Sequence, residues 1–187
     1  MKKIVSLLLV AMLAIFMVGC GSDNNESQGQ VDVADAQELL QKVWDNYADD
    51  EKFAAMGGDA DNTNTEGPGK FSVEDGNSLD VTLGFPAASA AKIDDAASLM
   101  HMMNANTFTC GAFHVVEGED AAAVSEEIKE NIKNRQWMCG FPDELVIVTV
   151  DNYVVSFFGA SDLIDIFQAN LQEVYPGAEV VCEEPIM

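Results

Sequence analysis

Residues 145–158 read Leu-Val-Ile-Val-Thr-Val-Asp-Asn-Tyr-Val-Val-Ser-Phe-Phe, and this stretch decides the fold. Two runs rich in β-branched and aromatic residues flank Asp151-Asn152, a pattern that predicts a β-hairpin with a two-residue turn. The facing pairs expected from that turn are Val150 with Tyr153, Val148 with Val155, and Val146 with Phe157. These pairs make one face of the hairpin wholly apolar. The other face is also too apolar to meet water without a cover.

Amphipathic helices are predicted on both sides of the hairpin. Asp120 is a candidate N-cap for one helix, and Ser161 is a candidate N-cap for a second, which Tyr175-Pro176-Gly177 ends. Their apolar faces are Ala121, Val124, Ile128 and Ile132 in the first, and Leu163, Ile166, Phe167, Leu171 and Val174 in the second. Apolar runs at 108–117 and 178–182 predict two more strands.

From residue 108 onward, the predicted order is strand, helix, strand, strand, helix, strand. This order predicts an α+β fold of the ferredoxin-like βαββαβ type, with an antiparallel sheet and both helices on one face. The regular core covers about residues 107–183 within a single domain over 31–187. An extra N-terminal helix over 31–53 has an apolar stripe, and we expect it to cover the other sheet face. A homodimer formed through that face is the alternative.

The connection between the N-terminal helix and this core is less regular. Residues 54–84 are rich in Gly, Asp, Asn and Thr, which predicts a surface excursion with a short strand-like stretch at 79–83. Residues 92–103 carry apolar side chains at helical spacing. We expect a short helix there.

The first twenty residues have the features of an export signal. Two lysines precede an apolar run that ends at Met17-Val18-Gly19-Cys20 and is shorter than the roughly 20 residues of a membrane-spanning helix. This pattern resembles bacterial lipoprotein signals. The resemblance implies that residues 1–19 are a signal peptide that is removed, and that Cys20 is lipidated and anchors the chain in the cell membrane. The polar composition of residues 20–30 predicts a flexible tether to an extracytoplasmic domain.

Charge narrows the choice of partner. The chain has 32 acidic and 9 basic residues, a formal net charge of −23. Nucleic-acid binding depends on Lys and Arg at phosphates, so this composition argues against a nucleic-acid partner. An acidic surface also repels anionic headgroups, so membrane attachment must come from the lipid on Cys20. We expect a cell-surface protein or a small ligand as the partner.

Three cysteines remain once Cys20 is lipidated, namely Cys110, Cys139 and Cys182. In a ferredoxin-like sheet the first and last strands are antiparallel neighbours, which predicts a disulfide between Cys110 and Cys182. One alternative is three reduced thiols that pack as small hydrophobes. Another is a three-cysteine metal site completed by His101.

The sequence gives little indication of a catalytic site. Phosphate-binding Gly loops, Cys-x-x-Cys, His-Glu-x-x-His and Gly-x-Ser-x-Gly are absent from the sequence. His114 shares a predicted strand face with Cys110, but four residues along a strand is too far for a direct hydrogen bond. We therefore expect no catalytic residue and no cofactor.

Two stretches carry metal-binding residue types. Met100-His101-Met102-Met103 offers soft ligands for copper(I), although methionines at this spacing more often pack a core. The loop that starts at Asp59 begins like a calcium loop, but it lacks the required glycine and has Lys70 in place of the bidentate glutamate. Only a weak, irregular calcium site is left open there. We expect no resident metal.

The C-terminal half carries three short motifs, Met103-Asn104-Ala105-Asn106, Asn134-Arg135-Gln136 and Asp151-Asn152-Tyr153-Val154-Val155. Through them and the signal, the chain resembles an uncharacterised family of small bacterial lipoproteins, domain of unknown function 4358. The insertion at 56–76 has no counterpart in that family. The resemblance implies a location on the surface of Gram-positive-type bacteria and supplies no active-site residues.

Taken together, these features predict a lipid-anchored extracytoplasmic binding or interaction module. The alternative is a small cell-surface enzyme, either a hydrolase or a thiol redox enzyme, that uses Cys139 or His114. A deep pocket converging on either residue favours the enzyme.

Overall fold

The computed structural model describes residues 33–138 and 140–186. The signal peptide, the lipidation site Cys20, the tether and Cys139 lie outside the described residues.

The described chain forms a seven-stranded sheet in which every pairing is antiparallel. Its strands are β1 (Ala55–Met56), β2 (Gly69–Lys70), β3 (Ile93–His101), β4 (Phe108–Val115), β5 (Glu144–Val150), β6 (Tyr153–Gly159) and β7 (Glu179–Pro185). Its helices are α2 (Ala36–Asn46), α3 (Gly76–Ser78), α4 (Ala121–Lys133) and α5 (Ser161–Val174), with helical turns η1 (Leu79–Leu83), η2 (Ala87–Lys92) and η3 (Ala105–Thr107). The sheet order is β1-β3-β4-β6-β5-β7, and β2 also pairs with β3. The α+β class is confirmed.

The hairpin is confirmed with its register. β5 and β6 pair Val150 with Tyr153, Val148 with Val155, and Val146 with Phe157. Asp151 in the turn has a φ of 52°, a left-handed conformation that Asp tolerates better than most residues. Asp120 caps α4 as predicted, since its carboxylate accepts a hydrogen bond from Ala122 N at 2.9 Å. Ser161 is instead the first residue of α5, and its backbone N–H donates to Asp143.

The expected helix at 92–103 is wrong, because residues 93–101 form strand β3, which lies between β4 and the short strands β1 and β2. Both of its faces are buried: Ala97 and Leu99 pack on one side of the sheet, and Ala96 and Met100 pack on the other. A strand covered on both faces loses the alternation that identifies strands in a sequence. The strand-like stretch at 79–83 is the helical turn η1.

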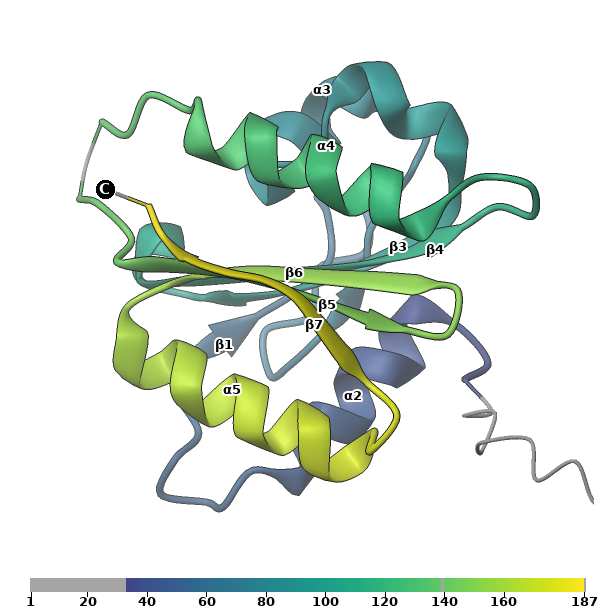
Figure 1. Cartoon of the computed structure of the whole chain (residues 1–187). Coiled ribbons are helices and arrows are strands. Elements are labelled where there is room, and N and C mark those ends of the chain that lie inside the picture. Colours follow the sequence, from purple (N-terminus) through teal and green to yellow (C-terminus); the bar gives the residue numbers. More distant parts are fainter. Residues whose placement is uncertain (1–32, 139, 187) are drawn as a thin grey trace, which may run out of the picture.

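The strand order differs from the ferredoxin-like one in a single placement. β7 pairs with β5 at one edge of the sheet, and β3 takes the place beside β4 that the last strand was expected to have. The connections from β4 to β5 and from β6 to β7 therefore both cross over one strand toward the β7 edge of the sheet. They start from β4 and β6, which run antiparallel to each other. Right-handed connections of this kind place their helices on opposite faces. Figure 1 shows α4 on one side of the sheet and α5 on the other, so the expectation that both share a face is wrong.

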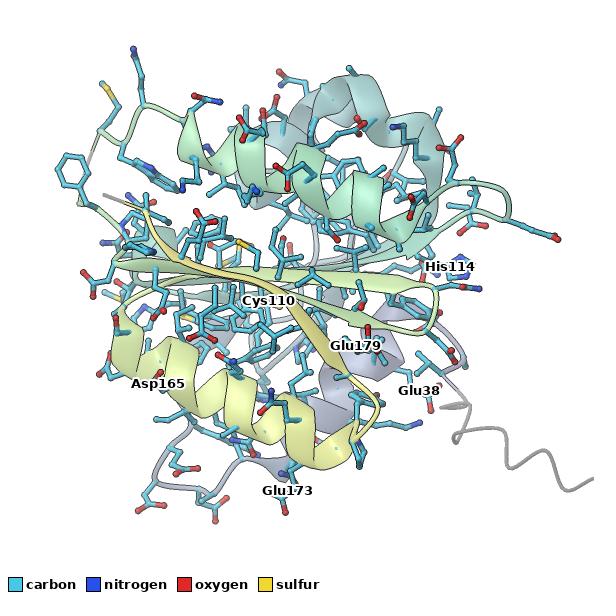
Figure 2. All side chains as sticks on the ribbon, viewed as in Figure 1. Glu38, Cys110, His114, Asp165, Glu173 and Glu179 are labelled. Atoms are coloured by element: carbon cyan, nitrogen blue, oxygen red, sulfur yellow. The ribbon has the colours of Figure 1, made fainter. Side chains whose placement is uncertain are left out.

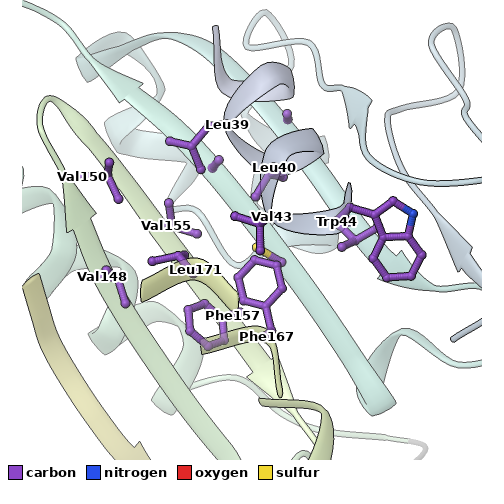
Figure 3. Packing of buried hydrophobic residues seen from close by; sticks show 14 of the residues in the cluster. Leu39, Leu40, Val43, Trp44, Val148, Val150, Val155, Phe157, Phe167 and Leu171 are labelled. Carbon is purple, nitrogen blue, oxygen red and sulfur yellow. The ribbon is translucent and has the colours of Figure 1, made fainter. Parts of the chain in front are cut away.

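The N-terminal helix is part of the folded domain, as predicted, but it shares a face with α5. The α2–α5 core contains Leu39, Leu40 and Val43 from α2, which packs against β3, β4 and α5, together with side chains of β5 and β6 (Figure 3). The Tyr175 hydroxyl donates to Leu39 O and joins the end of α5 to α2. Covering several large apolar side chains contributes about 1.5–3 kcal/mol for each.

The opposite sheet face forms the α4 core. Val124, Ile128 and Ile132 of α4 pack there against Leu145, Ile147, Val154 and Phe158. Phe71, Leu79, Leu83 and Phe85 complete the cover. Phe71, Leu79 and Leu83, which fall in the stretch expected to lie on the surface, are thus buried in this layer. Both faces of the sheet are covered within one chain.

Candidate interaction surface

His114 lies at one end of β4 and contacts a carboxylate rather than a cysteine. Its Nδ1 lies 2.5 Å from Asp94 Oδ1, where a bulge in β3 shifts the pairing register. Its ring packs against Tyr153 with centroids 4.9 Å apart. Cys110 is fully buried farther along the same strand, and burial raises the pKa of its thiol well above the ordinary value. Such a thiol stays protonated and is a poor nucleophile.

The predicted disulfide between Cys110 and Cys182 does not form, and both residues are free thiols. β6 and β5 lie between β4 and β7, which separates the two strands by about 14 Å at the usual spacing. Cys110 belongs to the α2–α5 core, whereas Cys182 packs on the α4 core. The prediction failed because it depended on the last strand pairing with the first.

The methionine-rich motif is divided by the strand that carries it. Met100 is buried in the α4 core, whereas His101 stacks on Phe53 across the sheet, with ring centroids 5.6 Å apart. His101 Nδ1 accepts a hydrogen bond from Met103 N at 3.3 Å. Neighbouring residues of a strand point to opposite faces, so this motif does not gather its soft ligands on one side.

The acidic loop uses its first carboxylate to hold its own backbone. Asp59 accepts hydrogen bonds from the backbone N–H groups of Asp61, Asn62 and Ser72. Burial tends to raise the pKa of Asp59, but these hydrogen bonds outweigh it and leave the pKa below the ordinary value. Within residues 33–138 and 140–186, no group of three or more His, Cys, Asp or Glu side chains could hold a metal ion.

Four large apolar side chains are exposed at one end of the sheet. We call Met102, Met103, Met138 and Phe141 the apolar tip; their exposed fractions are 42%, 80%, 88% and 58%. The two methionines of the first pair follow the end of β3, and the other pair lies in the connection from α4 to β5. Asn106 Nδ2 donates to Gly140 O at 3.2 Å and holds the two connections together.

The connection after α4 is fixed by residues that precede the exposed ones. The Arg135 guanidinium donates to the backbone oxygens of Asp80 and Val81 and lies 5.3 Å above the Trp137 ring. Trp137 in turn packs edge-on against Phe158 of β6. Arg135 and Trp137 are therefore fixed on the domain directly before Met138, and neither Met138 nor Phe141 belongs to the two cores.

A cluster of four carboxylates centred on Glu144 lies at the same end of the sheet as the apolar tip. We call Asp143, Glu144, Asp165 and Glu183 the acidic group; they come from the residue before β5, from its first residue, from α5 and from the end of β7. Burial raises the pKa of Glu144, and the nearby charges of Glu183 and Asp165 raise it further. The ion pairs of the described residues involve none of these four side chains. Figure 2 shows Asp165 at this end of the sheet, away from His114.

The chain enters the domain at the other end of the sheet. Asp95, near the start of β3, accepts a hydrogen bond from Ala36 N at 2.7 Å and so fixes the first residue of α2. The apolar tip begins directly after the end of the same strand. Six residues of extended chain between Asp95 and His101 span roughly 20 Å. In Figure 1 the start of α2 and the connection from α4 to β5 lie on opposite sides of the molecule.

No family model, curated protein or solved structure matches this chain. None of the helices in the described segments combines the length and the apolar character needed to cross a bilayer. The apolar tip was missed in the sequence because Met102 and Met103 were assigned to a helix. Met138 and Phe141 gave the only available signal, since large apolar residues are unusual in a connection beside Gly140 and Pro142.

Proposed function

We propose that this protein is a lipid-anchored extracytoplasmic interaction module that binds a cell-surface protein through the apolar tip. The observation that carries the proposal is the exposure of four large apolar side chains at the end of the sheet opposite the chain entry. The described chain begins at the entry end, so a tether that leads from Cys20 to this end would leave the apolar tip free to face away from the membrane. The lipoprotein-like signal supports the anchor.

The size of the apolar tip suits a small, reversible interface. Burying one large apolar side chain is worth about 1.5–3 kcal/mol, and association itself costs several kcal/mol. A few such side chains therefore support transient binding rather than an obligate complex. The apolar tip lies outside both cores, so a partner can cover it without unfolding the domain.

The anchor is tested by growing cells with a fatty-acid analogue that can be labelled. We expect the wild-type protein to take up the label and Cys20→Ala to lose it. Unchanged labelling of Cys20→Ala would remove the anchor from the proposal.

The binding surface is tested by placing a photo-reactive amino acid at position 138 in intact cells. Position 181 on β7 is the matched control, because Val181 is also apolar and 45% exposed but lies outside the apolar tip. We expect a defined cross-linked product from position 138 that Phe141→Ser weakens, and none from position 181. Equal products from both positions would contradict the proposed surface.

A cell-surface enzyme is the second candidate, and the contact between His114 and Asp94 is the observation that favours it. A carboxylate that orients an imidazole is one part of a general base. Activity against a panel of ester and peptide substrates that His114→Gln abolishes would favour the enzyme. Retained cross-linking from position 138 in that same variant separates the two functions.

A further inference from the structure

We infer that the apolar tip and the acidic group together bind a cationic amphipathic segment of a partner protein. The apolar side chains of that segment would pack on Met103, Met138 and Phe141, and its Lys and Arg side chains would meet the acidic group. This inference rests on the proposed function, because it names the class of partner for the same surface.

The apolar and acidic parts adjoin along the chain before β5. Phe141 lies two residues before Asp143, which directly precedes β5. Asp143 is held by backbone hydrogen bonds to Gly159 and Ile186, so the end of β6 and the end of β7 meet there. A segment that reaches across this end of the sheet contacts apolar side chains first and carboxylates next.

The acidic group lacks counterions within the described chain. Gln168 donates a neutral hydrogen bond to Glu183 at 3.1 Å, and the backbone of Ser161 donates to Asp143. Four carboxylates without a basic neighbour repel one another, and a bound cation relieves that repulsion. At the other end of the sheet, Lys70 lies 3.5 Å from Asp95. The acidic group thus differs from Asp95, because none of its four side chains has a Lys or Arg partner among the ion pairs of the described residues.

The same charges disfavour other occupants of this surface. A second copy of the chain would bring two acidic groups together, and each copy has a net charge of −23. Anionic lipids are repelled in the same way. Three of the four side chains in the apolar tip are methionines, whose flexible and polarisable thioethers adapt to partners of different sequence. A cationic amphipathic helix fits these properties, since its apolar face supplies anchors at regular spacing.

The test uses the full chain reconstituted in phosphatidylcholine nanodiscs, with empty nanodiscs as the blank. The probe is a designed helical peptide with Leu on one face and Lys on the other. A second peptide has the same Leu face with Glu in place of every Lys, and a third scrambles the Lys and Leu. We expect binding of the first peptide alone, weakening as salt is added.

Variants then test the contributions of the apolar tip and of the acidic group to binding separately. Met138→Gln with Phe141→Ser should weaken binding about tenfold, the usual effect of losing central apolar contacts. Glu144→Gln with Glu183→Gln should weaken it about fivefold at low salt and reduce the salt dependence. The controls Val181→Gln and Glu179→Gln should leave binding unchanged, and thermal unfolding checks that every variant is folded.

Each contrary outcome points to one failure. Equal binding of the Lys and Glu peptides, or no binding of either, would overturn the cationic partner. The proposed function would still stand if cross-linking from position 138 persisted in cells. Loss of that cross-link would remove the proposed function itself. Sedimentation of the protein as a dimer that Phe141→Ser dissociates would replace the cationic segment with a second copy.

Discussion

The two ends of β3 differ in whether the nearby charged and apolar side chains have partners within the domain. At its start, Asp95 accepts from Ala36 and lies near Lys70, and Asp94 contacts His114. At its end, exposed methionines lie beside carboxylates that take part in none of the ion pairs of the described residues. The first end closes the domain around α2, whereas the second leaves apolar surface and negative charge available. We infer that the start of β3 stabilises the fold and that the end of β3 belongs to the binding surface.

The largest effect is expected from a charge placed in the α2–α5 core. Val43→Asp buries an unpaired carboxylate at a position with no exposure and should lower the free energy of unfolding by more than about 3 kcal/mol. Phe141→Asp in the apolar tip should leave it within about 0.5 kcal/mol of the wild type. Urea unfolding followed by circular dichroism measures both. Similar losses would mean that the apolar tip is part of the core.

A smaller effect is expected at the entry end. Asp95→Ala removes the hydrogen bond to Ala36 N and should cost about 1–2 kcal/mol, because that part-buried N–H loses its partner. Asp165→Asn at the other end should cost nothing, since it reduces repulsion in the acidic group. The same urea titration compares the two variants. A larger loss from Asp165→Asn would reverse the assigned roles of the two ends.

The pH dependence of the free energy of unfolding is expected to report on Glu144 in the acidic group. Because the pKa of Glu144 is raised by burial and then by Glu183 and Asp165, the folded state binds this proton more tightly than the unfolded state does. Glu144 therefore adds stability as the pH falls through its raised pKa, and that gain is absent at neutral pH. Glu144→Gln should stabilise the protein near neutral pH and flatten the rise on mild acidification. Urea midpoints across that range measure this effect, and an unchanged profile would contradict the crowding of charges.

The smallest effect at the entry end is expected from Lys70→Met. The Lys70 side chain is 55% exposed, and its ion pair with Asp95 spans 3.5 Å. Exposed pairs of this kind contribute about 0–1 kcal/mol. We expect a loss below about 0.5 kcal/mol in thermal unfolding, clearly smaller than that of Asp95→Ala. An equal loss would show that Lys70, and not the Ala36 N–H, is the important partner of Asp95.

The hairpin and the amphipathic helix after Asp120 could be predicted because their signals are local. Facing pairs follow from a two-residue turn, and a cap followed by a regular apolar face marks a helix. β3 could not be predicted, because burial on both faces gave it apolar residues in both strand registers and at helical spacing. That error moved the last strand to the wrong edge and led to the wrong disulfide.

The apolar tip could not be predicted because it depends on segments that are distant in sequence. Met103 follows β3, Met138 follows α4, and Glu183 comes from the last strand, so only the folded chain brings these segments to one end of the sheet. Cys20, in contrast, is a local prediction from the signal pattern, and it lies outside the described residues. Its lipidation stays a prediction.

Methionine oxidation in intact cells tests the central claim most directly. Mild peroxide converts exposed thioethers to sulfoxides at rates that follow their accessibility, and mass spectrometry reads each site. A Val181→Met variant supplies an exposed reference thioether outside the apolar tip. Relative to that reference, we predict that Met103 and Met138 oxidise more slowly in cells than in the purified protein, because a partner covers them. Equal relative rates in cells and in the purified protein would contradict the account.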